Sequence, residues 1–178
     1  MAAFAPRTAP GLSWRDGMSP HNLREFAALE AGPARLEQYI TRAVAEYGTI
    51  TTGAQLAAGM EGFFSEPDAE VSAGSFLEFQ LEDCLRLGRD GIWGWYDDDW
   101  AIWEDWGFDP GQIEVPVSIW HGGKDKFIPL AHGEWLAAKV PGARAHLLPD
   151  EGHMSLWVRH YGAVLDELLA SRPQIARS

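Results

Sequence analysis

Two segments near the carboxyl end of the chain hold residues that could act together in catalysis. Asp125 lies in GGKDKFIP, after an apolar stretch, and His153 lies in PDEGHMSL, 28 residues further on. A carboxylate can accept a hydrogen bond from one imidazole nitrogen, which leaves the other nitrogen free to act as a general base. The alternative interpretation is that Asp125 caps a turn and His153 is a surface histidine. Spacing alone leaves both open.

The elements around these residues favour the catalytic pairing. Short apolar segments at 117–120 and 145–148 predict strands, and helices are predicted from Pro129 to about Lys139 and from about Met154 to Ala170. This strand–helix–strand–helix order is typical of a parallel sheet covered by helices. Functional groups gather at the carboxyl ends of such strands, so both side chains are expected at one edge of the sheet.

The preceding part of the chain has a different pattern. It predicts helices after Ser19-Pro20, after Pro33, across 54–63 and across 72–87, with Asp97, Asp98 and Asp99 at the N-terminus of another helix. Residues 2 to 5 are expected to be the end of a buried strand. Three strands are too few for a stable parallel sheet, because its strands need neighbours on both sides. The chain is therefore expected to be the last part of a larger domain and to fold poorly alone.

Two motifs resemble those of a known family. Gly123-Lys124-Asp125-Lys126-Phe127-Ile128-Pro129 resembles the G-x-D-x-x-V/I-P segment that carries the acid in α/β-hydrolases, and Asp150-Glu151-Gly152-His153 resembles that family's D-x-G-H segment. The resemblance implies a partial α/β-hydrolase fold, a parallel-sheet remnant with a helical cap insertion. Residues 1–18 would hold a remnant core strand and the entry to the cap, 19–108 the cap, and 109–178 the carboxyl-terminal core.

The same resemblance identifies what the chain lacks. In the family the nucleophile precedes the acid and sits in a G-x-S-x-G elbow. No such motif occurs here: Ser13 and Ser75 lack the pattern, and Cys84 is expected in a helix core. The implied enzyme hydrolyses an ester, amide or related bond with Asp125 and His153 as catalytic residues. If its nucleophile were an aspartate, the reaction could instead be dehalogenation or epoxide opening.

The chain by itself is predicted to be inactive, and three explanations stay open. The start could be misassigned or the gene truncated, which we favour. A separate chain could supply the first half, as in a split enzyme. The protein could also be a non-catalytic interaction module.

Aromatic residues are the candidates for substrate contacts. Five of nine tryptophans fall between residues 93 and 106, and they could line an apolar pocket under the cap or join the cap to the core. His121 could line the site or pack beside it. The expected substrate-binding residues are Trp100, Trp103, Trp106, Phe108, His121 and Phe127.

Composition limits the other classes of function. The net charge of −12, without clustered Lys or Arg, argues against a nucleic-acid partner. No apolar run approaches the 18 or more residues of a membrane span. The lone cysteine favours a reducing, cytoplasmic location, and no metal or nucleotide motif implies a cofactor. The expected partners are a small-molecule substrate of the parent enzyme and, in a split enzyme, the chain that supplies the missing half.

Overall fold

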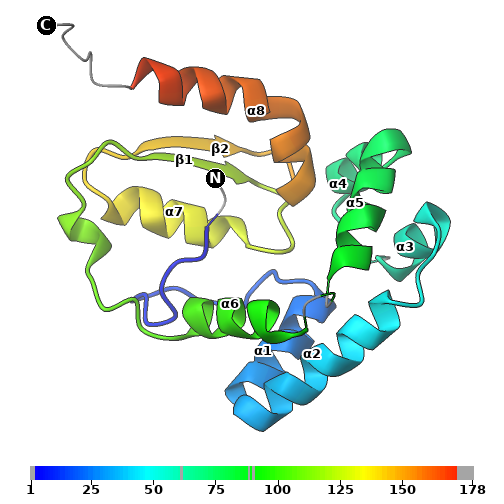
Figure 1. Ribbon diagram of the computed structural model, residues 1–178. Helices are drawn as coiled ribbons and strands as arrows, with labels where there is room; N and C mark the ends of the chain where they lie inside the picture. Colours follow the sequence, from blue (N-terminus) through cyan, green and yellow to red (C-terminus); the bar gives the residue numbers. More distant parts are fainter. Residues whose placement is uncertain (1–2, 61, 88, 90, 172–178) are drawn as a thin grey trace, which may run out of the picture.

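The computed structural model describes residues 3–60, 62–87, 89 and 91–171. Most of the regular structure is helical, and a two-stranded sheet lies between helices (Figure 1). In chain order the elements are α1 (Pro20–Glu30), α2 (Pro33–Tyr47), α3 (Gly53–Gly59), α4 (Glu66–Val71), α5 (Gly74–Arg86), α6 (Trp93–Trp103), the 3-10 helix η1 (Pro110–Gln112), β1 (Ser118–Gly122), α7 (Leu130–Lys139), β2 (Arg144–Leu148) and α8 (His153–Ala170).

The sheet is parallel, as the sequence predicts. Ser118 pairs with Arg144 and Gly122 with Leu148, so the two strands end level with each other. Helix α7 connects the strands on one side of the sheet, and α8 covers the other side (Figure 1). β1 is buried from Ile119 to Gly122 because helices pack on both of its faces. The carboxyl ends of both strands therefore open at the same edge.

The first described segment contributes to the core without forming a strand. The strand expected at residues 2 to 5 is wrong over residues 3 to 5, and residue 2 lies outside the described residues. Ala5 is buried; its N–H donates to Nδ1 of His132 at 3.1 Å and its carbonyl accepts the Trp14 indole N–H at 2.8 Å. Because side chains satisfy these backbone groups, the segment can be buried without a neighbouring strand.

The helices between residues 20 and 103 have an apolar core of their own. α1 begins where the Ser19 hydroxyl accepts the N–H of Asn22, with Pro20 as the first helical residue, as the sequence predicts. The core is formed by Trp14, Met18, Phe26, Leu29, Leu36 and Ile40, with partly buried rings of α6 packed against it. In Figure 1, α1, α2 and α6 lie together on the side of α7 away from the sheet.

Three details of this region differ from the sequence-based expectations. Asp97 to Asp99 do not begin a helix, because α6 begins at Trp93 and the acids lie in its interior. The short helix α4 is not anticipated by the sequence, since six residues are too few to show a helical period. The helix expected at 72–87 is α5, and Cys84 on it is only half-buried.

Candidate active site

Asp125 is held rigidly just beyond β1. Its side chain is buried, and Oδ1 accepts the backbone N–H groups of Phe127 and Ile128, both at 2.8 Å. The motif around the aspartate therefore folds as a turn over its own carboxylate. This arrangement leaves Oδ2 free to face another group.

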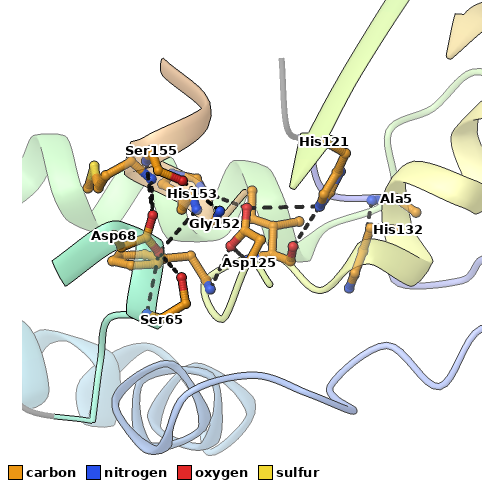
Figure 2. A network of polar contacts seen from close by, with 12 residues as sticks. Ala5, Ser65, Asp68, His121, Asp125, His132, Gly152, His153 and Ser155 are labelled. Atoms are coloured by element: carbon orange, nitrogen blue, oxygen red, sulfur yellow. Dashed lines mark hydrogen bonds and ion pairs between the residues drawn. The ribbon is translucent and has the colours of Figure 1, made fainter. Parts of the chain in front are cut away.

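Oδ2 of Asp125 faces His153. The Nδ1 atom of His153, the first residue of α8, lies 2.8 Å from Oδ2 (Figure 2). The turn after β1 is joined to the segment before α8 by backbone hydrogen bonds from Gly123 to the Leu148 carbonyl and from Lys124 to the Glu151 carbonyl. The pairing expected from the sequence is thus present, with both residues at the carboxyl ends of neighbouring strands.

This pairing sets the chemistry of the imidazole. When Nδ1 carries the proton donated to Asp125, Nε2 is left as an unprotonated acceptor. The His153 side chain is 21% exposed, and among the described residues no hydrogen bond involves its Nε2. The geometry is that of a general base whose tautomer is fixed by a buried acid.

Close approach of the two turns depends on glycines. A Cβ on Gly122 would lie 2.4 Å from the Gly152 carbonyl oxygen, and one on Gly123 would lie 2.7 Å from the Cα of Pro149. Each distance is shorter than packing of heavy atoms allows. The pair Gly122-Gly123 therefore lets the turn that carries Asp125 touch the turn that carries His153.

His121 packs behind the acid. It is fully buried, its Nε2 lies 2.7 Å from the Ile128 carbonyl and 3.9 Å from Oδ2 of Asp125. Burial lowers the pKa of this histidine, so the neutral ring donates from Nε2 to the carbonyl. The sequence left open whether His121 lines the site or packs beside it, and this placement favours packing.

The aromatic candidates separate into two places. The Phe127 ring stacks on the His153 imidazole, with centroids 4.7 Å apart, and Phe63 and Phe64, which precede α4, lie against Phe127. The structure does not bring the other aromatic candidates to this cluster. Trp100 and Trp103 pack on the apolar core of the helices between residues 20 and 103. Trp106 packs near Ala5 and Ile119, and Phe108 is exposed and stacks on Trp106.

The sequence did not predict the residue that binds the backbone N–H of His153. Asp68, on α4, is fully buried and accepts the backbone N–H groups of His153, Met154 and Ser155 (Figure 2). Phe63 and Phe64 were missed as well. The one available signal for Asp68 was its position three residues after Ser65, a helix-start pattern that implies no distant partner.

The described residues give no metal-ligand cluster, since no three His, Cys, Asp or Glu side chains among them are placed to hold one ion. In the same part of the chain, no helix combines the length and apolar character needed to cross a bilayer.

Segments of this chain match curated proteins. The pimeloyl-[acyl-carrier protein] methyl ester esterase of Aromatoleum aromaticum is 41% identical over 75 residues, 41% of this chain and 27% of the esterase. The 2-hydroxy-6-oxononadienedioate/2-hydroxy-6-oxononatrienedioate hydrolase of Comamonas testosteroni is 37% identical over 54 residues, 29% of this chain and 19% of that protein. The probable lysophospholipase BODYGUARD 2 of Arabidopsis thaliana is 39% identical over 46 residues, 26% of this chain and 10% of that protein.

The fold matches a solved structure over a longer range. A hydrolase from Pseudomonas aeruginosa PA01 superposes with a TM-score of 0.52, covering 76% of this chain and 49% of that one at 24% identity. The chain therefore resembles a portion of an α/β-hydrolase rather than the whole length of one. The predicted resemblance and partial α/β-hydrolase fold are therefore confirmed, and the chain is related to α/β-hydrolase esterases. No protein-family model matches it. It spans 10% to 27% of the length of the three curated relatives and 49% of the length of the Pseudomonas hydrolase.

Proposed function

We propose that Asp125 and His153 are the acid and base of a catalytic triad that hydrolyses an ester or related bond in a small, partly apolar substrate. The observation that carries this proposal is the 2.8 Å contact between His153 Nδ1 and Asp125 Oδ2. Asp125 is fixed by two backbone N–H groups, so it can orient the ring without moving. The similarity to a methyl ester esterase supports an ester as the substrate bond.

In this reaction Nε2 of His153 moves the protons. It accepts the proton of a nucleophilic hydroxyl as the hydroxyl oxygen attacks the ester carbonyl, and it donates that proton to the leaving alcohol. It then accepts a proton from the water that hydrolyses the acyl intermediate and returns it to the nucleophile. Asp125 stabilises the imidazolium that forms in each half of the reaction.

The nucleophile is proposed to come from a segment outside these 178 residues, in a longer chain or in a separate one. The sequence has no G-x-S-x-G elbow. Within the described part of the chain, no serine hydroxyl or cysteine thiol is hydrogen-bonded to His153. We therefore expect the 178 residues alone to show no triad-dependent turnover, and the parent protein to use a serine.

The apolar part of the substrate is proposed to contact the aromatic cluster of Phe127, Phe63 and Phe64. Phe127 lies directly on the imidazole, whereas Phe63 and Phe64 come from the cap. Apolar and aromatic walls with a few placed polar groups are typical of small-molecule sites. This assignment favours Phe127 over the tryptophans of α6 as the substrate-contacting ring.

The test uses the native protein from its source cells, tagged at its own gene, with and without His153→Ala. We expect hydrolysis of short-chain p-nitrophenyl esters and a kcat/KM at least about 10³-fold lower in the variant. Equal activity in the two proteins would refute the role of His153. A purified 178-residue chain that hydrolyses the esters, and loses this activity with His153→Ala, would refute the external nucleophile.

A second candidate is one component of a split hydrolase, favoured by the outer face of α8. Five exposed apolar side chains lie along this helix: Val158, Tyr161, Leu165, Leu168 and Leu169. Such a row is typical of a surface that packs against another segment. A co-purifying chain with a G-x-S-x-G elbow would support this candidate. A stable complex with an unrelated protein, unaffected by His153→Ala, would instead support a non-catalytic interaction module.

A further inference from the structure

A carboxylate from the cap lies at the first turn of the helix that begins with His153. Asp68 has no solvent exposure. Its Oδ1 accepts the N–H of Met154 at 2.8 Å and of Ser155 at 3.0 Å, and its Oδ2 accepts the N–H of His153 at 3.1 Å (Figure 2). The first four N–H groups of any helix lack an intrahelical partner. Asp68 therefore satisfies three such groups of α8 from a different part of the chain.

The cap also fixes the orientation of this carboxylate. Oδ2 of Asp68 accepts the Ser65 hydroxyl at 2.7 Å and the Ser65 N–H at 3.4 Å. Asp68 is thus bound on one side by its own helix and on the other by α8. A buried carboxylate is stable only when donors surround it, so this group has little freedom to move independently of either helix.

Gly152 makes the contact between the two helices sterically feasible. A Cβ at this position would lie 2.2 Å from the Ser65 hydroxyl oxygen and 2.3 Å from Oδ2 of Asp68. The φ of Gly152 is −99°, which other residues adopt freely. The glycine before the histidine is therefore needed for space rather than for backbone conformation.

His153 is consequently held between two carboxylates with different roles. Asp125 pairs with its imidazole at 2.8 Å, whereas Asp68 pairs with its backbone N–H. The second carboxylate also lies at the positive end of the helix dipole of α8, where a negative charge stabilises the helix. A displacement of α4 would move the start of α8 and, with it, the ring that Asp125 orients.

We propose that Asp68 is a positioning residue through which the cap sets the place of His153. This inference rests on the proposed function of His153 as the base. The competing view is that Asp68 only caps a helix. In that case its loss would change the free energy of unfolding but would leave the pairing between the imidazole and Asp125 intact.

The experiment uses NMR on the full 178-residue chain and needs no activity. The readouts are the low-field Nδ1–H signal of His153 and the amide exchange rates of His153, Met154 and Ser155. Asp68→Asn keeps the size of the side chain but removes its charge and one acceptor. We expect the Nδ1–H signal to be lost and the three amides to exchange at least about tenfold faster. The matched control is Glu66→Gln, an exposed acid on the same helix, which should change neither readout.

A second variant tests the same contact without altering the charge. Gly152→Ala should push α4 away from α8 and should give the same loss of signal. If either variant is folded and keeps the Nδ1–H signal of His153, the proposal is wrong, whether or not the three amides exchange faster. If neither variant folds, Ser65→Ala takes their place, because it removes the 2.7 Å hydrogen bond that orients Oδ2 of Asp68. It should weaken the Nδ1–H signal of His153, and an unchanged signal would overturn the proposal.

The two proposals fail independently. Activity of the native protein that is indifferent to His153→Ala would refute the catalytic role, whereas these NMR signals report only on the position of the ring.

Discussion

The Phe127 ring lies nearly parallel to the imidazole of His153, with centroids 4.7 Å apart and planes inclined by 20°. Phe63, from the helical region between residues 20 and 103, meets Phe127 edge-on at 4.1 Å. One face of the candidate base is therefore covered by an aromatic ring that itself contacts this helical region. The hydrogen bond from Nδ1 to Asp125 limits rotation of the imidazole in its own plane, and the stacking limits tilting of the ring out of that plane.

Phe127→Leu should weaken this arrangement without removing the apolar surface. We expect the free energy of unfolding to fall by about 0.5–1.5 kcal/mol, because the aromatic contacts with His153 and Phe63 are lost. The ring protons of His153 should shift downfield in NMR spectra because the ring current of Phe127 is gone. Phe79→Leu, at an exposed ring, is the control. Unchanged His153 shifts in Phe127→Leu would contradict the stacking.

Asp125→Asn in the native protein should lower kcat far more than it changes KM. The amide can accept only through its oxygen and tends to stabilise the wrong tautomer of His153, so we expect a loss of about 10⁴-fold in kcat. Steady-state kinetics with a p-nitrophenyl ester would measure it. Asp150→Asn, an exposed acid three residues before His153, should keep wild-type kcat. A loss shared equally by both variants would argue against a specific role for Asp125.

Helices α1 and α6 carry a pair of acids that should make stability depend on pH. Burial and the neighbouring Glu25 carboxylate raise the pKa of Asp99 to about 8, and burial raises the pKa of Glu25. The folded chain then holds a proton that the unfolded chain releases near pH 4. Stability should therefore fall as pH rises from about 4 to about 8, by at most about 1.4 kcal/mol per pH unit.

Asp99→Asn tests this dependence. The variant should be the more stable protein at about pH 8 and should show a flatter profile, because Asn cannot ionise beside Glu25. Urea unfolding across the range would measure the effect. Asp97→Asn, at an exposed position of the same helix, should retain the wild-type slope. The same slope in all three proteins would mean that the acids are not coupled in the folded state.

Gly123→Ala should separate the two turns that carry the candidate site. The new Cβ would lie 2.7 Å from the backbone of Pro149, and relief of this clash should cost about 1–3 kcal/mol of stability. The low-field Nδ1–H signal of His153 should weaken in the same variant. Gly162→Ala in α8 is the control, because no atom lies within 4 Å of its Cβ, and it should stabilise the chain by up to about 1 kcal/mol. Destabilisation by both would point to a general intolerance of added methyl groups.

The pairing of Asp125 with His153 could be predicted because it follows from local patterns and one topological rule. Each residue comes shortly after a short apolar strand, and adjacent parallel strands end at one edge. The helix starts at Ser19-Pro20 and Pro33 were equally local signals. In each case the determining residues lie within a few positions of the feature that they specify.

The parts that could not be predicted depend on contacts between distant segments. Asp68 binds backbone groups 85 to 87 residues away, and nothing near it in the sequence indicates that partner. Asp97 to Asp99 follow the rule for a helix start, yet Asp99 is buried next to Glu25 in the interior of α6. Tertiary packing decided that position against the local preference. The strand expected at residues 2 to 5 is wrong over residues 3 to 5 for the same reason, since the backbone of Ala5 is hydrogen-bonded to the side chains of Trp14 and His132.

The carboxylate of Asp68 lies at the start of α8 but comes from a distant segment, which limits how segments could be exchanged between related proteins. Asp68 belongs to α4, in the helical region between residues 20 and 103, although the N–H groups that it accepts belong to α8. A chimera that received the helical region of a related protein in place of residues 20–103 would therefore leave three amides of α8 without acceptors, unless the new region supplied an acid at the same place. Exchange of this helical region is limited by compatibility with a single helix terminus.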